Sequence, residues 1–439
     1  MAGSVLIHYT GLLLELRTMP KPTPLLSSER LGTRHRQWPT SAYVHLPFCR
    51  QRCFYCDFPI AVLRDGHWTH PSAEITTYVD CLCQEIALTP SGSNPLQTVF
   101  LGGGTPSLIA PAQLQQILEA LEQQFGFASS MELSMEMDPG TFTLAQVQAY
   151  QAAGVNRVSL GVQAFADQLL QVCGRGHTVK EIYEAIDLLH QAKVTNFSLD
   201  LISGLPSQTL AAWEQTLMTA VEIDPVHLSI YDLTIEPTTL FSQRYQPGRN
   251  PLPTDETTAQ MYRFASRHLQ GAGYQHYEIS NYAQPGYQCR HNQVYWHNQP
   301  YYGFGMGATS YVWGQRFSRP RKLKDYSQWV QTLPRDQGQI DCPVNTQLEI
   351  IQETLMLGLR LAEGVRIEQL QALCGASTVE NLLTCLTPFT AQGWIDPQCL
   401  RGPDPSIRLT DPEGFLFSNT VLASLWQVLD ELMLMELPL

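Results

Sequence analysis

Three cysteines, Cys49, Cys53 and Cys56, stand in one short segment of the sequence. Three thiolates on one loop can bind three irons of a [4Fe–4S] cube, which leaves the fourth iron open to a small chelating ligand. Electron-transfer clusters normally use four cysteines, and a structural zinc site normally has four Cys or His ligands. The next histidine after these cysteines is His67. The spacing therefore favours a three-cysteine iron–sulfur cluster over a zinc site.

A strand-like segment, residues 43–48, directly precedes the first of these cysteines. Chance seldom places a CxxxCxxC pattern there, so incidental buried cysteines are the weaker interpretation. The pattern, with an aromatic residue before its last cysteine, resembles the radical S-adenosylmethionine (SAM) superfamily. The resemblance implies that SAM chelates the open iron through its amino and carboxylate groups. It also implies that the reduced cluster cleaves SAM to a 5′-deoxyadenosyl radical.

Residues that could hold such a ligand follow several other strand-like segments. Glycines in the run 102–106 allow a ligand to approach the backbone and its amide groups, and an arginine can bind a carboxylate in a fork. Taken singly, each is equally a tight turn, a solvated acid or a surface charge. Together they predict one pocket, formed by Gly103, Gly104, Thr105, Glu136, Gln163, Arg175 and Asp200.

Strand-like and helical segments alternate from residue 42 to about residue 279, which argues for βαβ units and a parallel sheet. The predicted strands are Ala42–Leu46, Thr98–Leu101, Glu132–Met135, Arg157–Gly161, Asn196–Ile202, His227–Leu233 and His276–Ile279. The predicted helices are Ala73–Thr89, Pro111–Gln124, Thr143–Ala152, Val179–Gln191, Ala211–Glu222 and Thr254–Leu269. The chemistry should lie at the carboxyl ends of the strands. The fold class is therefore α/β, and the radical SAM resemblance implies a partial, open (β/α)6 barrel.

The pattern changes after about residue 322. Helical segments are expected at Thr346–Leu361, Ile367–Leu373, Val379–Gln392 and Phe415–Met435, with a β-hairpin between the last two, over residues 393–410. Helices followed by a hairpin are similar to a winged-helix module, so the C-terminal part is expected to be α+β. The interpretation divides the chain into a flexible leader (1–41), the barrel with its extension (42–322) and a C-terminal domain (323–439).

Composition limits the possible functions of the 439 residues. The net charge of −13 disfavours nonspecific nucleic-acid binding, which needs a basic surface. It thereby weakens the interpretation of the C-terminal module as part of a DNA-binding regulator. The 11 cysteines are scattered and odd in number, which suits a reduced cytoplasm better than a secreted disulfide framework. No apolar run approaches the ~20 residues of a membrane span, and the N-terminus lacks the features of a signal peptide.

The motifs between residues 43 and 206 resemble the oxygen-independent coproporphyrinogen III oxidases and their haem-chaperone relatives. They are Tyr-x-His-x-Pro-Phe-Cys, Gly-Gly-Gly-Thr-Pro, Ser-Leu-Gly-Val-Gln, Gly-Arg-x-His and Asp-Leu-Ile-x-Gly-Leu-Pro, in the family's order. The resemblance extends over nearly all residues from 40 to the end. It implies that Cys49, Cys53 and Cys56 bind the cluster and that Tyr55 contacts a second SAM molecule. The SAM contacts that it implies are Tyr43, Gly103, Gly104, Thr105, Glu136, Gln163, Arg175 and Asp200.

Two departures separate the branches of this family. The oxidases carry a fourth cysteine two residues after the third, where this chain has Phe58. The segment Cys289–Trp296 matches the His-Asn-x-x-Tyr-Trp element of the haem-chaperone branch, which makes His291 a candidate haem ligand. Without the resemblance, a structural histidine in an aromatic core is the preferred interpretation of His291.

The resemblance therefore favours a haem chaperone with a [4Fe–4S] cluster and SAM over a coproporphyrinogen III oxidase that forms vinyl groups by radical chemistry. Its implied partners are haem, target haemoproteins such as respiratory enzymes, and an electron donor for the cluster, with no nucleic acid. The expected location is the cytoplasm, with transient membrane association.

Overall fold

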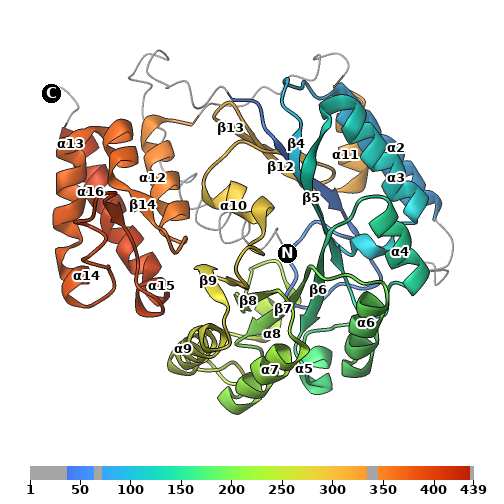
Figure 1. Ribbon diagram of the computed structural model, residues 1–439, viewed down its shortest axis with the longest axis horizontal. Helices are drawn as coiled ribbons and strands as arrows, with labels where there is room; N and C mark the ends of the chain where they lie inside the picture. The colour runs from blue at the N-terminus through green and yellow to red at the C-terminus, as the bar shows by residue number, and fades with distance from the viewer. Residues whose placement is uncertain (1–36, 64–71, 334–344, 436–439) are drawn as a thin grey trace.

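The computed structural model describes residues 37–63, 72–333 and 345–435. Its centre is a nine-stranded sheet in the order β11-β1-β4-β5-β6-β7-β8-β10-β9. Seven neighbouring strands are parallel: β11 (Tyr302–Phe304), β1 (Ser41–Leu46), β4 (Leu96–Gly103), β5 (Phe127–Met137), β6 (Arg157–Gln163), β7 (Phe197–Ser203) and β8 (His227–Asp232). The sheet curves with its helices on the outside (Figure 1). The open α/β barrel expected from the sequence is confirmed.

Local sequence explains why these elements form. Every residue of β1 and β7 is buried, as expected for parallel strands covered on both faces. The helices are α2 (Ala73–Leu88), α3 (Pro111–Phe125), α4 (Leu144–Ala152), α5 (Asp167–Val172), α6 (Val179–Gln191), α7 (Leu210–Ile223), α8 (Leu240–Arg244) and α9 (Asp255–Gly271). At the start of most of these helices, a serine or threonine hydroxyl accepts a hydrogen bond from the backbone amide of the third helical residue. At Thr143 and Thr178 the side chain of that third residue also bonds back to the cap amide, which completes a capping box.

Two features of the barrel differ from the sequence-based prediction. The segment expected as a seventh parallel strand is β9 (Gln275–Glu278), which pairs antiparallel with β10 (Asn281–Ala283) at the edge of the sheet. The family resemblance places a strand and turn at residues 302–308, and the structure has β11 there, pairing with β1 on its other side. Helices α5 and α8 were missed. All of these elements are short, so hydrophobic periodicity is too weak to reveal them.

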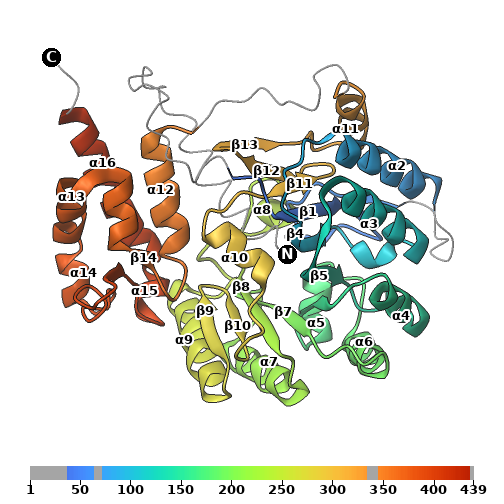
Figure 2. The same cartoon turned by 45° about the horizontal axis from the view of Figure 1, so that its top comes forward.

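The C-terminal domain packs beside α9, β9 and α10 (Arg290–Trp296), as the two ribbon views agree (Figures 1 and 2). Its elements are α12 (Gln347–Gly358), β14 (Val365–Arg366), α13 (Ile367–Cys385), α14 (Thr387–Ala391), β15 (Ser406–Ile407), α15 (Glu413–Leu416) and α16 (Ser418–Met435). The expected hairpin is reduced to one antiparallel bridge between Ile395 and Leu409, while β15 pairs with β14. The expected last helix is broken at Phe417, between α15 and α16.

The first helix after residue 322 packs against the barrel. The hairpin β12 (Thr309–Val312) and β13 (Gln315–Ser318) is followed by α11 (Leu323–Val330), which lies against α2 of the barrel. Of the expected leader, residues 1–36 lie outside the described residues. The segment 37–40 leads into β1 and shares one cleft with residues of α10 and of the start of β4. None of the helices in the described ranges has the length and apolar character that a membrane crossing requires.

Backbone hydrogen bonds join the barrel to the C-terminal domain at β9. The amide of Ile279 donates to the carbonyl of Arg360 at 2.9 Å, and the amide of Ala362 donates to the carbonyl of Tyr277 at 3.0 Å. The carboxyl of Glu278 is fully buried at this junction, near Arg360. Burial raises the pKa of Glu278 from its usual 4.5 to about 7, although hydrogen bonds and Arg360 oppose the shift.

This buried acid makes stability depend on pH. The folded chain holds a proton on Glu278 that the unfolded chain has already lost, so stability falls as the pH rises from about 4.5 to 7, by up to ~1.4 kcal/mol per pH unit. In Glu278→Gln the slope of unfolding free energy against pH should be shallower over that range. Urea unfolding of the wild-type and variant proteins at several pH values measures this slope. Equal slopes would contradict the raised pKa of Glu278.

Candidate functional site

The three cysteines lie on the loop that follows β1, at the carboxyl end of the sheet. Short strands β2 (Phe48–Cys49) and β3 (Ala61–Val62) pair and close this loop. Its middle is fixed to the loop after α5, because the amide of Phe54 donates to the carbonyl of Cys173 at 2.9 Å. The side chain of Gln51 donates to the carbonyl of Gly174 at 2.8 Å. The thiols therefore stand on a loop held in place by the opposite side of the barrel.

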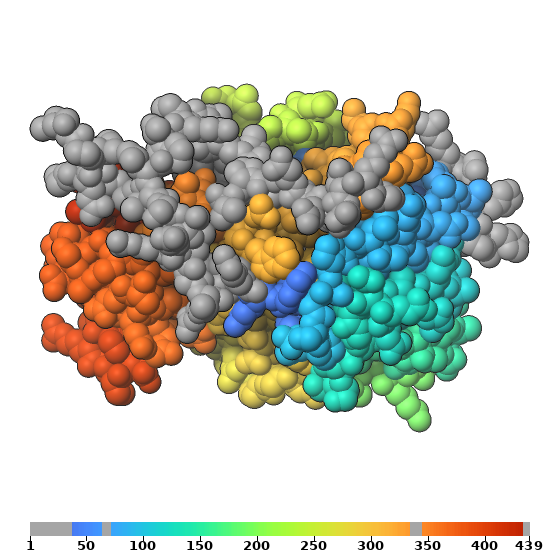
Figure 3. All heavy atoms as spheres, turned by 90° about the horizontal axis from the view of Figure 1, so that it is seen from above, coloured from blue at the N-terminus to red at the C-terminus, as the bar shows by residue number. Residues whose placement is uncertain are grey.

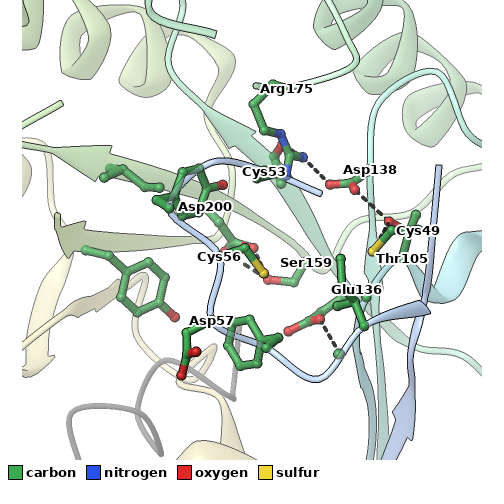
Figure 4. Close-up of a pocket in the computed structure, with 18 of the residues that line it drawn as sticks. Cys49, Cys53, Cys56, Asp57, Thr105, Glu136, Asp138, Ser159, Arg175 and Asp200 are labelled. Carbon is green, nitrogen blue, oxygen red and sulfur yellow. Dashed lines mark hydrogen bonds and ion pairs between the residues drawn. The ribbon is translucent and has the colours of Figure 1, made fainter. Parts of the chain in front are cut away.

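All three thiols line one cavity, which the carboxyl ends of β4 to β8 surround (Figure 4). Two neighbouring side chains point at sulfur: the guanidinium of Arg175 lies 3.5 Å from Cys53 Sγ, and the hydroxyl of Thr105 lies 3.8 Å from Cys49 Sγ. Donors of this kind stabilise a thiolate. Among the described residues, no three Cys, His, Asp or Glu side chains surround a single metal ion. A [4Fe–4S] cube does not require three ligands around one ion, because each thiolate binds a separate iron.

The glycine-rich loop after β4 is shaped by the cysteine loop packed against it. Gly104 has no room for a side chain, because a Cβ there would lie 2.7 Å from backbone atoms of Pro47 and Phe48. Gly103 adopts a φ of 120°, which favours glycine. Its amide donates to Glu136 Oε2 at 3.0 Å. Both glycines and Thr105 line the cavity.

An arginine and several carboxylates complete the wall. Arg175 forms an ion pair with Asp138, which also accepts a hydrogen bond from the hydroxyl of Thr105 at 2.9 Å. Asp200 accepts from the hydroxyl of Ser159, 2.9 Å from each carboxylate oxygen. Burial raises the pKa of Asp200. Figure 4 shows these groups directed toward the space beside the thiols.

The lining suits the two cofactors that three cysteines imply. SAM carries an ammonium group, a carboxylate and ribose hydroxyls. Carboxylates such as Glu136 and Asp200 are matched to the ammonium and hydroxyls, and Arg175 is matched to the carboxylate. A [4Fe–4S] cluster would be held by Cys49, Cys53 and Cys56, and when bound it supplies an electron to SAM.

Two of the predicted SAM contacts do not line the cavity. The hydroxyl of Tyr43 lies 3.0 Å from His45 Nδ1, and His45 Nε2 lies 2.9 Å from the carbonyl of Pro59. A carbonyl only accepts, so Nε2 of His45 carries a proton. Burial lowers the pKa of His45 to about 4, so the ring is neutral and its Nδ1 accepts from the hydroxyl of Tyr43. Gln163 is fully buried with a φ of 68°, and its amide group has no partner among the described residues. Tyr55 does line the cavity.

His291, the predicted haem ligand, lies away from this cavity and is fully buried. Its Nδ1 lies 2.7 Å from the hydroxyl of Thr98, and its Nε2 lies 2.8 Å from the hydroxyl of Tyr295. Burial lowers its pKa to about 3. A haem iron could reach either nitrogen only if one of these hydroxyls withdrew and α10 moved. In this arrangement His291 is a packing residue of α10, which matches the alternative left open from the sequence.

Sequence reasoning missed several residues of the cavity. Asp138 is the clearest, because it lies two residues after Glu136 and therefore on the same face of the strand end. That alternation was a usable signal. Asp57, Asp232 and Glu236 also line the cavity, but they stand on loops or at a strand end without a spacing that marks them.

Comparison with known proteins identifies the family. Residues 43–220 match the radical SAM superfamily, and residues 345–404 match the HemN C-terminal domain. The chain is 46% identical to the haem chaperone HemW of Synechocystis over 408 residues, covering 90% of this chain and 98% of that protein. The chain belongs to the HemW family. It is also 33% identical to HemW of Bacillus subtilis, over 88% of this chain and 98% of that protein.

Family membership extends beyond bacteria and agrees with a solved fold. A mouse relative, the mitochondrial radical S-adenosyl methionine domain-containing protein 1, is 33% identical over 94% of this chain and 89% of that protein. The solved structure of coproporphyrinogen III oxidase (HemN) from Escherichia coli matches with a TM-score of 0.72 and 24% identity, over 95% of this chain and 98% of that chain. At this identity the structural match shows the fold. Membership of a radical SAM family implies a [4Fe–4S] cluster and SAM, as the cavity suggests.

Variants of the polar wall test the SAM contacts. A charge-assisted hydrogen bond contributes about 1.5–3 kcal/mol, so Glu136→Ala, Arg175→Ala and Asp200→Ala should each weaken SAM binding about ten- to a hundredfold. Isothermal titration of the reconstituted protein measures the affinity. Glu184→Ala, at an exposed position on α6, is the control. Unchanged affinity in all three variants would remove these residues from the site.

Proposed function

We propose that this chain is a haem chaperone, which binds haem and delivers it to target haemoproteins while carrying a SAM-binding [4Fe–4S] cluster. The observation that carries the proposal is the match over nearly the full length of proteins named as haem chaperones. Phe58 supports it, because the resembling oxidases carry an additional cysteine at this position. Cys49, Cys53 and Cys56 are proposed as the cluster ligands.

The charge of the cavity supports a chaperone over an oxidase. Six carboxylic acids line it, on Asp57, Glu136, Asp138, Asp200, Asp232 and Glu236. Arg175 is the only lysine or arginine among the described lining residues, and it is paired with Asp138. Coproporphyrinogen III carries four propionates, which this wall would repel. A zwitterion of the size of SAM, with its ammonium and hydroxyls, is better matched.

The roles proposed for single residues follow from this arrangement. Glu136, Arg175 and Asp200 contact SAM through their charges, and Gly103, Gly104 and Thr105 form the adjoining backbone wall. Tyr55 is proposed to contact a second SAM molecule, as the family resemblance implies. Gln163 and Tyr43 support the wall from behind. An electron donor reduces the cluster. We further propose a cytoplasmic location, with transient membrane association when the target is a respiratory enzyme.

One anaerobic experiment separates the two functions. Reconstituted protein is mixed with haem in one sample, and with coproporphyrinogen III, SAM and a reductant in another. The chaperone proposal expects a haem absorption spectrum that saturates at a defined ratio, and no protoporphyrinogen IX. Conversion of coproporphyrinogen III with consumption of SAM would contradict the chaperone proposal and support the oxidase function instead.

A further inference from the structure

A second cleft opens at the other end of the barrel, where β1 and β4 begin. Its volume is about 570 Å³, within the ~300–1,000 Å³ of ligand pockets. Its walls are the segment 37–41, the start of β4, the exposed face of α10 and residues 299–300. Figure 3 shows the first described residues (dark blue) at this face, beside the start of β4 (light blue).

Helix α10 divides its residues between two faces. His291, Asn292, Tyr295 and Trp296 are buried in the protein. The opposite stripe has the spacing i, i+3, i+4, i+7, and all four of its residues line the cleft. They are Arg290, Gln293 and Val294 of the helix and His297, the residue that follows it. The element that suggested haem binding from the sequence therefore presents a different histidine to open space.

His297 is a partly exposed histidine with one ring nitrogen open to a ligand. Its side chain is 40% exposed, and its Nδ1 lies 3.6 Å from a carboxylate oxygen of Glu363. This separation is longer than a hydrogen bond, so the carboxylate acts on the ring through its charge. Across the described residues, no hydrogen bond occupies Nε2. His291 lacks this freedom, since hydroxyls occupy both of its nitrogens.

The charge of this cleft is opposite in kind to that of the SAM cavity. Among its described lining residues there is no aspartate or glutamate, although the chain carries a net charge of −13. Arg290 is exposed, and the amides of Asn94, Gln97 and Gln293 add neutral donors. Haem carries two carboxylates, which an arginine and amides can bind.

The cleft also offers an aromatic surface. Trp38 lines it, and its indole packs edge-on against Trp313 with ring centroids 4.5 Å apart. Trp313 is 42% exposed, one of the few large exposed apolar side chains among the described residues. Gly92 allows this arrangement, since a Cβ there would lie 2.2 Å from the Trp38 ring. Trp313 is not part of the cleft wall, so among the described lining residues Trp38 alone offers a large aromatic ring to an apolar macrocycle.

We propose that haem binds in this cleft with Nε2 of His297 as an axial ligand, Arg290 at a propionate and Trp38 against the ring. The proposal rests on the proposed haem-chaperone function and assigns its binding site. It separates the haem site from the SAM cavity, which lies at the opposite, carboxyl end of the strands. It also gives α10 a double role, as a packing element on one face and a ligand-bearing element on the other.

Haem titration of the full chain tests the site. His297→Ala should shift the haem absorption maximum and weaken binding about tenfold or more, the range seen when even a supporting partner of a metal ligand is lost. Added imidazole should restore the wild-type spectrum in His297→Gly, because it can occupy the vacated ligand position. Gln293→Glu, a change of shape by one atom, should weaken binding by placing a carboxylate in the cleft. His190→Ala, an exposed histidine on α6, is the matched control and should bind haem normally.

The outcomes separate the site from the function. Wild-type protein that takes up no haem would end the proposed function itself. Haem uptake with an unchanged spectrum in His297→Ala, and no response to imidazole, would overturn this site and leave the chaperone standing. A spectrum altered in His291→Ala but not in His297→Ala would assign the ligand to the buried histidine and imply that α10 moves.

Discussion

A chain in which Cys49, Cys53 and Cys56 are all replaced by alanine is expected to leave anaerobic reconstitution without a [4Fe–4S] cluster. The wild-type chain should contain about four irons and four sulfides, and the variant close to none, because each thiolate holds a separate iron. The loop itself should persist, since it is fixed by backbone contacts at Phe54 and by the side chain of Gln51. Iron and sulfide analysis, with the cluster absorption spectrum, measures the loss.

A matched triple variant controls for the loss of thiols as such. Cys83, Cys385 and Cys399 are partly exposed and lie outside the cavity. Their replacement by alanine should leave a full cluster. A full cluster in the first variant, or its loss in the second, would contradict the assignment of the ligands.

The strands that position this site were predictable because most of their residues are apolar and buried. Val99, Phe100 and Leu101 form a short continuous apolar run in β4, whereas Leu199 and Leu201 in β7 alternate with the polar residues Ser198 and Asp200. Segments as short as β9, β10 and β11 carry no such pattern. Their pairing is decided by contacts across the fold, such as the bridge between Glu278 and Leu361, and no local window contains both partners.

The site was predictable in its residue types but not in its orientations. A motif shows that His291 belongs to an aromatic segment, yet it does not show which face of α10 turns inward. In the structure His291 is buried and bonded to Thr98 and Tyr295, whereas His297 lines the open cleft. Likewise, the sequence places Arg175 near the thiols, but its ion pair with Asp138 depends on two different strands meeting at one edge.

Removing the buried cation Arg319 is expected to destabilise the barrel by about 3–5 kcal/mol, because its partner would remain as an uncompensated buried charge. Arg319 Nε lies 2.7 Å from Glu85 Oε1, and the two side chains are 2% and 1% exposed. Glu85 also accepts from the hydroxyl of Tyr326 at 2.7 Å and from the amide of Gly305 at 2.9 Å. One carboxylate thus joins α2, α11 and the turn after β11. Urea unfolding of Arg319→Met measures the loss.

Two further variants show whether the loss of stability in Arg319→Met comes from the unpaired carboxylate of Glu85. Lys180→Met removes a pair with Glu184 whose side chains are 84% and 56% exposed, so it should cost no more than about 0.5 kcal/mol. The double variant Glu85→Gln with Arg319→Met should recover part of the loss, because glutamine still accepts one hydrogen bond but carries no charge. If Arg319→Met cost as little as Lys180→Met, the carboxylate would be able to reach water or another cation. The buried pair would then contribute nothing to holding α2 and α11 against the edge of the sheet next to the cysteine loop.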